Sequence, residues 1–531
     1  MKNTKLFMFA ACTLFLAACG KQTVKIMTPP DASNRVLFSA EQLQTTLDKA
    51  GYQVMMQQGD TTFSDPEIKT ILLTEVNDTT LKKEGFHITT TGNLTRVSGR
   101  DGSGVIYGCR ELIDRVNDSE GKLNFPEELK DGPEMVLRGA CVGLQKMTYL
   151  PGHGVYEYPY TPESFPWFYD KEQWIKYLDM LVANRMNSLY LWNGHPFASL
   201  VKLEDYPFAL EVDEETFKKN EEMFSFLTEE ADKRGIFVIQ MFYNIILSKP
   251  FAEHYGLKTQ DRNRPITPLI ADYTRKSIAA FIEKYPNVGL LVCLGEAMCT
   301  VEDDVEWFTK TIIPGVKDGL QALGRTDEPP LLLRAHDTDC KLVMDAALPI
   351  YKNLYTMHKY NGESLTTYEP RGPWSKIHTD LSSLGSIHIS NVHILANLEP
   401  FRWGSPDFVQ KAVQAMHNVH GANALHLYPQ ASYWDWPYTA DKLPNGEREF
   451  QLDRDWIWYQ TWGRYAWNSH RDRADEIGYW NHQLGQFYGT SDENAGNIRI
   501  AYEESGEIAP KLLRRLVSRK ETVRRYCWGC L

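Results

Sequence analysis

The chain of 531 residues has little of what marks several classes of protein. It has no excess of basic residues, because 57 lysines and arginines stand against 69 aspartates and glutamates, for a net charge of −12. That balance disfavours nucleic acid or another polyanion as the main partner. Low-complexity runs are few, and a hydrophobic content of 43% is typical of globular proteins rather than disordered ones. The length predicts roughly two to four domains.

The cysteines and glycines also lack the patterns of common metal and cofactor sites. The nine cysteines do not show the spacing of a zinc site. Cys527 and Cys530 form a C-x2-C that is either a redox pair or a feature of the chain end, and it lacks the strand-to-helix context of a redox motif. The glycine-rich stretch from Gly99 to Gly104 does not fit a strand–GxGxxG–helix unit and indicates a tight turn. We therefore expect neither a metal nor a cofactor.

The N-terminus resembles a bacterial lipoprotein signal. Lys2 and Lys5 precede the apolar run Leu6–Leu16, which is too short for a stable membrane span. The following letters, LAACG, place Cys19 after small residues at the cleavage point. We expect cleavage before Cys19 and a lipid on its thiol, which would anchor the mature chain to the bacterial cell envelope at the periplasmic face or the cell surface. The lipid would be its only membrane contact.

The chain divides into segments of different pattern. A polar stretch follows the signal, then a segment of alternating helix and strand signals that includes a helix over 39–51 and a strand at "IKTILLTE". The last segment is rich in aromatic residues, is helical and has no stop signal, which favours a domain that continues. In chain order we predict a signal peptide (1–18), a tether (19–34), a small α/β domain (35–132), a barrel (133–440) and a helical C-terminal region (441–531).

Eight short apolar runs, separated mostly by helical stretches, fill the predicted barrel segment. They are "VLRGACVG" (136–143), "SLYLW" (188–192), "IFVIQMF" (236–242), "GLLVCLG" (289–295), "LLLRAHD" (331–337), "NLYTMHK" (353–359), "VHILANLE" (392–399) and "ALHLYP" (424–429). Continuous rather than alternating apolar runs are typical of strands covered on both faces. Eight strand–helix units over ~300 residues predict a (β/α)8 TIM barrel. The alternative is an open doubly wound sheet, which usually shows a glycine fingerprint early.

Polar side chains follow most of these runs, at the edge where TIM barrels hold their active sites. Glu296 closes the fourth run and Glu399 the seventh. Glycoside cleavage needs two carboxyl groups in different environments, one protonated for the leaving oxygen and one ionised for the anomeric carbon or a water. We therefore predict Glu296 and Glu399 as catalytic residues. The residues predicted to bind the sugar by stacking, hydrogen bonds or charge are Trp192, Asn193, His195, Tyr243, Arg334, His336, Asp337, His358, Lys359, Arg402, Trp403 and Tyr428.

The order of these segments resembles glycoside hydrolase family 67, the α-glucuronidases. "EGFHI…GRDGSGVIYGCRELIDRV" is similar to the N-terminal α/β domain found in families 20 and 67. "YPNVGLLVCLGEAM" resembles the unit with the acid glutamate, here Glu296, and "LLLRAHDTD" the segment whose arginine, here Arg334, meets a uronate carboxylate. "VHILANLEPFRWG" resembles the unit with a catalytic base, here Glu399. The resemblance implies a (β/α)8 barrel, a helical C-terminal domain and an inverting hydrolase of glycan chain ends.

Two positions depart from the family pattern. The family has an aspartate after the sixth strand, whereas "NGESLTTYEP" offers only Glu363 and Glu369. Ala297 and Met298 stand where the family has a basic residue. We therefore predict an α-glucuronidase-like glycosidase of an oligosaccharide or polysaccharide that need not be a uronide. The alternative is a catalytically inactive, glycan-binding lipoprotein on the same fold.

Overall fold

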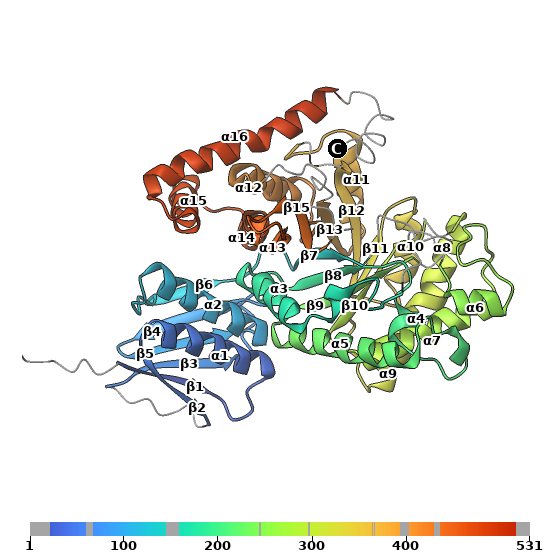
Figure 1. The fold of residues 1–531 in the computed structure, drawn as a ribbon, viewed down its shortest axis with the longest axis horizontal. Helices are drawn as coiled ribbons and strands as arrows, with labels where there is room; N and C mark the ends of the chain where they lie inside the picture. The colour runs from blue at the N-terminus through green and yellow to red at the C-terminus, as the bar shows by residue number, and fades with distance from the viewer. Residues whose placement is uncertain are drawn as a thin grey trace, which may run out of the picture.

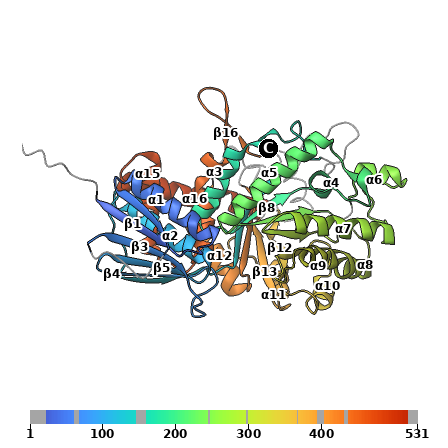
Figure 2. The same ribbon diagram turned by 90° about the horizontal axis from the view of Figure 1, so that it is seen from below.

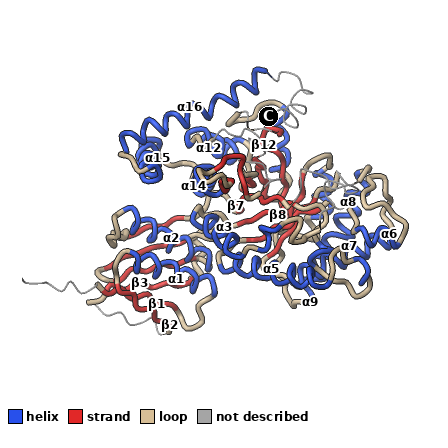
Figure 3. Tube along the Cα trace, in the orientation of Figure 1, coloured by secondary structure: helices blue, strands red, loops and turns tan. Residues whose placement is uncertain are grey.

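The structure is a computed structural model that describes residues 22–59, 67–144, 159–243, 246–295, 298–363, 365, 367–392, 403–429 and 436–516. Three parts follow one another along the chain: a small domain in blue, a barrel in green to yellow, and helices in orange to red (Figure 1). The small domain lies beside the barrel in Figure 2 as well, and Figure 3 shows their strands as two separate groups with helices around them. Among the described helices, none combines the length and apolar character that crossing a membrane requires.

The N-terminal domain is a six-stranded mixed sheet with two helices. Its elements are β1 Thr23–Thr28, α1 Asn34–Lys49, β2 Gln53–Gln58, β3 Lys69–Glu75, β4 Phe86–Thr91, β5 Leu94–Gly99, α2 Gly102–Asp118 and β6 Glu128–Asp131. The strand order is β2-β1-β3-β5-β4-β6, with β4 antiparallel to both of its neighbours. The helices α1 and α2 pack on each other, and Arg35 of α1 reaches Asp232 of the barrel, 2.7 Å away.

Two boundaries predicted in this region are wrong. The tether predicted over 19–34 contains β1, which pairs with β2 and β3 and buries Val24 and Ile26 completely. The helix predicted over 39–51 begins at Asn34. Ser39 does not cap it, because the Ser39 hydroxyl donates to the Arg35 carbonyl 2.7 Å away, a bond that a serine makes inside a helix. The predicted tight turn is present, and Asp101 caps α2 by accepting from Gly104 N at 2.9 Å.

Eight parallel strands close into a barrel in the order β10-β11-β12-β13-β14-β7-β8-β9, which confirms the predicted TIM fold. The strands are β7 Leu137–Gly143, β8 Ser188–Trp192, β9 Phe237–Phe242, β10 Val288–Val292, β11 Leu331–Arg334, β12 Leu354–Glu363, β13 Ile387–Val392 and β14 Ala424–Leu427. The helical segments around them are η1 Pro166–Tyr169, α3 Lys171–Ala183, α4 Phe197–Leu200, η2 Pro207–Ala209, α5 Glu214–Lys233, α6 Lys249–His254, α7 Pro268–Lys284, α8 Val301–Trp307, η3 Phe308–Ile312, α9 Ile313–Ala322, α10 Cys340–Ala347, α11 Pro373–Ser382, α12 Pro406–Gln414 and η4 Ala415–Val419.

The sixth and seventh strands differ from their predicted bounds. The seventh strand is β13, which begins at Ile387, before the predicted start at 392, and is described as far as Val392. Its sequence IHISNV mixes apolar residues with His388, Ser390 and Asn391, all buried, so it does not show as a continuous apolar run. The sixth strand, β12, continues past Lys359 to Glu363.

A helical region follows the barrel and packs on it. It consists of β15 Tyr438–Lys442, β16 Arg448–Phe450, α13 Gln451–Arg454, α14 Trp456–Trp467, α15 Arg473–Tyr488 and α16 Asp492–Leu516. The helix α14 buries Trp458, Trp462 and Trp467 completely or nearly so, and Trp467 stacks near Phe86 and Tyr107 of the N-terminal domain. Large aromatic side chains bury much apolar area each, so they hold the three parts together.

Candidate active site at the barrel mouth

Side chains at alternate positions of the strands fill the inside of the barrel, and aromatic rings form its last layer at the C-terminal end. Trp192 ends β8, and its ring centroid lies 6.0 Å from that of Tyr243 and 5.5 Å from that of Tyr428. All three side chains are almost fully buried within this layer. The structure therefore brings together three of the aromatic residues predicted to bind the sugar.

Arg334 brings a buried positive charge to the same layer. Its side chain is 4% exposed, and its Cζ lies 5.2 Å from the centroid of the Trp192 ring, within reach of a cation–π contact. Its Nη1 lies 3.6 Å from Cys293 Sγ on β10. Lys359 stands two positions after the inward-facing Met357 on β12, so it shares that face of the strand. Two cations of neighbouring strands thus point toward the mouth.

The turn that leads to Glu296 is fixed by its neighbours. Gly295 N donates to Thr338 Oγ1 at 3.0 Å, and that hydroxyl donates to the His336 carbonyl at 3.0 Å. A Cβ at residue 295 would lie 1.9 Å from the Asp337 carbonyl oxygen, so only glycine fits there. The strand end β10 is therefore locked onto the loop that follows β11, directly before the predicted acid.

Three further predicted residues lie on the rim of the mouth. Asn193 donates from Nδ2 to the Leu144 carbonyl at 3.0 Å and accepts from His195 N at 2.9 Å, which fixes the turn after β8. His336 and Asp337 follow β11, with His336 Nε2 3.7 Å from Asp337 Oδ2. Asp337 has a φ of +52°, in the left-handed region that few non-glycine residues occupy.

Three predicted residues lie elsewhere. His358 points outward from β12 toward α11, with its ring centroid 5.6 Å from that of Trp374, and burial lowers its pKa to about 4. His195 packs between Phe197 and Tyr273, and burial lowers its pKa to about 4, so both histidines are neutral at pH 7. Trp403 donates from Nε1 to the Gly506 carbonyl of α16 at 2.9 Å and packs on Phe408 and Trp458.

Four predicted residues, Cys19, Glu296, Glu399 and Arg402, lie outside the described residues. The corrected strand bounds still bear on the choice of the second carboxylate. The described part of β13 reaches Val392, and the segment that leads on to Glu399 lies outside the described residues, so the place of Glu399 at a strand end stays a prediction. Glu363 stands at the end of β12.

Sequence reasoning missed two polar features inside the barrel. Asn391 Nδ2 donates to His426 Nδ1 at 2.6 Å, and the His426 ring centroid lies 4.1 Å from that of Tyr190. The second feature is Cys293, whose Sγ lies 3.6 Å from Arg334 Nη1. The Asn391–His426 pair could have been predicted from polar residues inside a buried strand, once that strand is recognised in the sequence. Within the part of the chain that the structure describes, no three His, Cys, Asp or Glu residues gather as metal ligands.

The fold and the mouth can now be compared with known proteins. No protein-family profile matches the chain, and no curated protein sequence does. A family GH20 β-N-acetylhexosaminidase from Streptomyces coelicolor A3(2) is 12% identical, with a TM-score of 0.53 over 88% of this chain and 92% of that chain. A family GH115 4-O-methyl-α-glucuronidase with specificity for decorated arabinogalactans is 13% identical, with a TM-score of 0.56 over 95% of this chain and 64% of that chain. These likenesses show a fold shared with glycoside hydrolases.

One solved structure is far more similar. It is a GH138 enzyme targeting pectin rhamnogalacturonan II, with 74% identity and a TM-score of 0.87 over 93% of this chain. This chain spans 56% of that chain's length. The family 67 assignment has no support among these structures, because the protein at high identity is of family GH138. The predicted likeness of the N-terminal domain to family GH20 agrees with the shared fold.

Proposed function

We propose that this chain carries the glycosidase activity of a family GH138 enzyme and acts on a pectin rhamnogalacturonan II glycan. The observation that carries the proposal is the 74% identity over 93% of the chain to a GH138 enzyme targeting that polysaccharide. The inward layer at the mouth agrees with it, because aromatic rings and a buried arginine are suited to a sugar ring that bears a charge.

In this proposal Glu296 is the general acid. It follows the fully buried strand β10, and the Gly295 turn leads the chain from that strand to the mouth. A carboxyl group with apolar walls on one side has a raised pKa, which keeps it protonated for the leaving oxygen. Arg334 and Lys359 hold a carboxylate or hydroxyls of the substrate, and Trp192 stacks on the ring or closes the pocket beneath it.

We propose Glu363 as the second carboxylate, in place of Glu399. TIM barrels place catalytic residues at the C-terminal ends of their strands. Glu363 stands at that end of β12, which supports it as the second carboxylate. The separation of the two carboxyl groups decides the stereochemistry, with about 5–5.5 Å for retention and about 6.5–9.5 Å for inversion. Family 67 no longer supports inversion, so NMR of the first-formed anomer is the measurement that assigns it.

The activity is tested on three glycans chosen from the comparisons. Purified protein is incubated with rhamnogalacturonan II oligosaccharides, with a decorated arabinogalactan and with a β-N-acetylhexosaminide, and released sugars are separated by anion-exchange chromatography. We expect release from rhamnogalacturonan II alone. Binding to it without release would instead indicate a glycan-binding barrel, and release only from another substrate would contradict the proposed glycan.

We also propose that the mature chain is a lipoprotein of the bacterial cell envelope, acylated at Cys19. The support is the LAACG motif after an apolar run. Mass spectrometry of protein extracted from membranes should find an acylated N-terminal Cys19. An unmodified chain that begins at another residue would contradict the anchor.

A further inference from the structure

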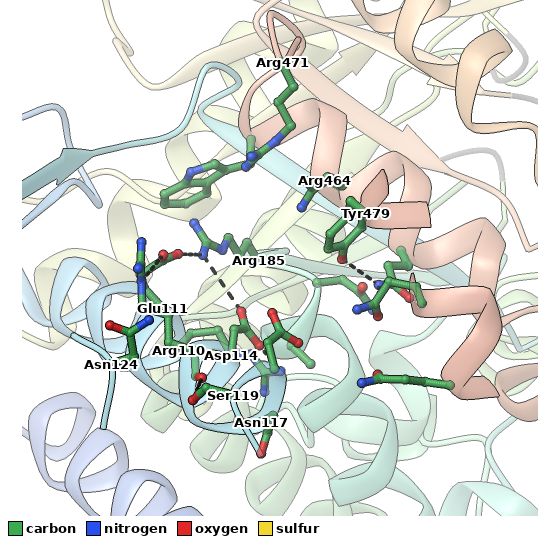
Figure 4. Close-up of a pocket in the computed structure, with 18 residues that line it drawn as sticks. Arg110, Glu111, Asp114, Asn117, Ser119, Asn124, Arg185, Arg464, Arg471 and Tyr479 are labelled. Carbon is green, nitrogen blue, oxygen red and sulfur yellow. Dashed lines mark hydrogen bonds and ion pairs between the residues drawn. The ribbon is translucent and has the colours of Figure 1, made fainter. Parts of the chain in front are cut away.

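A cavity of about 720 Å³ lies at the other end of the barrel, where the three parts of the chain meet (Figure 4). One wall is α2 of the N-terminal domain, and the opposite wall is formed by α14, α15 and the loop between them. The turn between α3 and β8 forms the floor. Because this turn precedes β8, the cavity lies at the N-terminal ends of the strands, away from the mouth. Its volume is within the range of ligand pockets, roughly 300–1,000 Å³.

Arg185 occupies the centre of the cavity and pairs with two carboxylates of its α2 wall. Its Nη2 lies 2.7 Å from Glu111 and 4.0 Å from Asp114, both on α2, and its Cζ lies 4.8 Å from the Trp467 ring centroid. Arg185 has a φ of +56° at the end of α3, a position that usually takes glycine. A non-glycine residue in this strained backbone conformation is retained where the contacts of its side chain offset the strain.

The opposite wall carries a positive charge without a counter-ion. Arg464 is paired with Glu476 through two hydrogen bonds of 2.6 and 2.7 Å, but the guanidinium of Arg471 has no hydrogen-bond or carboxylate partner among the described residues. Figure 4 shows Arg471 extending from the loop toward Arg185. Burial and the charge of Arg464 lower the pKa of Arg471, and Arg185 adds to this, while the charges of Glu476 and Asp131 act the other way without pairing with it.

The remaining lining offers hydrogen bonds rather than apolar surface. Carboxamides line it from both walls and from the floor: Asn117, Asn124, Asn184, Gln460, Gln483 and Gln486. The ring of Tyr479 is covered by Arg464, whose Cζ is 3.4 Å from its centroid. Trp467 is fully buried, and Arg138 and Arg185 lie over its ring. Within the described lining no open ring face is left for a nucleobase, whereas amides and one free cation match hydroxyls and an oxyanion.

We propose that this cavity binds a small acidic sugar, with the carboxylate on Arg471 and the hydroxyls on the carboxamides. The site is separate from the mouth, so a failure of the proposed hydrolysis would not contradict binding in the cavity. A ligand here would contact the N-terminal domain, the barrel and the C-terminal helices at once, and would stabilise their association. An oxyanion could also come from free phosphate, so the test must separate the two sources.

The experiment is calorimetric titration of the full chain with galacturonate, with galactose and with inorganic phosphate. The variants are Arg471→Ala, Arg334→Ala to remove the cation of the mouth, and Arg371→Ala as a control, since Arg371 has a side chain 79% exposed. We expect galacturonate to bind at least ten times more tightly than galactose or phosphate. Arg471→Ala should abolish that binding or weaken it at least tenfold, and the other two variants should retain it.

Thermal unfolding without ligand separates a binding role from a structural one. Because Arg471 has no counter-ion, Arg471→Ala should leave the melting temperature unchanged or raise it, whereas loss of a structural contact lowers it. Arg471→Ala is also measured in the Arg334→Ala protein, where the mouth lacks its buried cation. The proposal is overturned if galacturonate does not bind, if its binding to that protein survives Arg471→Ala, if phosphate binds as tightly as galacturonate, or if Arg471→Ala lowers the melting temperature.

Discussion

The two ends of the barrel differ in how they treat a buried arginine. At the mouth, Arg334 lies over Trp192 and beside a cysteine, in a layer of aromatic rings. At the other end, Arg138 and Arg185 are surrounded by carboxylates and backbone carbonyls that hold the small domain to the barrel. These paired arginines stabilise the association of the domains, whereas Arg334 lies at the end where TIM barrels place their active sites.

The largest effect should come from the proposed acid at the mouth. Glu296→Gln should lower the rate roughly 10²–10⁴-fold on substrates with poor leaving groups, because no proton is then delivered to the leaving oxygen. Activated aryl glycosides, which need less protonation, should lose much less. The measurement is kcat/KM on both substrate types for the variant and wild type. An equal loss on both would count against Glu296 as the acid.

Loss of the second carboxylate should lower the rate by a similar factor, and the measurement decides between Glu363 and Glu399. Glu363→Ala should lower kcat roughly 10²–10⁴-fold, and Glu399→Ala should not. Glu369 is the matched control on the same loop, since it is partly exposed and lies 3.9 Å from Arg371. Full activity of Glu363→Ala together with loss of activity in Glu399→Ala would return the role to Glu399.

At the opposite end the largest effect should be on stability. Arg138 is fully buried and its Nη2 lies 2.7 Å from Glu84 Oε2, so Glu84→Gln leaves a buried charge without its partner. That change should lower the free energy of unfolding by about 3–5 kcal/mol. Glu222→Gln is the control, because the pair of Glu222 and Lys171 is exposed to solvent, which screens its attraction, so its loss should have little effect. Urea unfolding measures both, and equal losses would contradict the role of the buried pair.

Acid should destabilise the barrel through its buried histidines. Burial lowers the pKa of His195 to about 4 and that of His378 to about 3, from 6.5. His378 Nε2 donates to the Tyr360 carbonyl at 3.0 Å, so its Nδ1 accepts from His388 Nε2 at 2.8 Å. This series of hydrogen bonds requires both imidazole rings to be neutral.

Because the folded pKa is below the unfolded one, the unfolded state binds more protons, and stability falls as the pH drops from 6.5 toward 4. At pH 5 each histidine should cost about 2 kcal/mol. Urea unfolding at pH 7 and pH 5 measures this, and His378→Phe should reduce the difference. The control His470→Ala, at an exposed histidine, should leave the stability difference between pH 7 and pH 5 unchanged. If His378→Phe also leaves that difference unchanged, buried His378 is not its cause.

The barrel could be predicted from the sequence because most of its strands are continuous apolar runs. The start of the seventh strand was misplaced because IHISNV buries polar side chains that bond to neighbouring elements, His388 to His378 and Asn391 to His426, and no apolar run marks it. Glu399 lies outside the described residues, so its role stays a prediction. Trp192, Tyr243, Arg334 and Tyr428 lie together at the mouth because they stand at or just beyond strand ends, and their binding role stays a prediction. Trp403 instead packs on α16, a contact that sequence spacing does not reveal. The ionic cavity could not be predicted, since its walls come from segments hundreds of positions apart.

We expect hydrolysis to take place at the mouth and not at the opposite end of the barrel. The most direct test is kcat/KM on rhamnogalacturonan II oligosaccharides for wild type, Arg334→Ala and Arg471→Ala in parallel. Hydrogen bonds to a charged group are worth about 1.5–3 kcal/mol, so Arg334→Ala should lose roughly 10–150-fold, while Arg471→Ala should match wild type. Wild-type activity in Arg334→Ala together with a large loss in Arg471→Ala would contradict it.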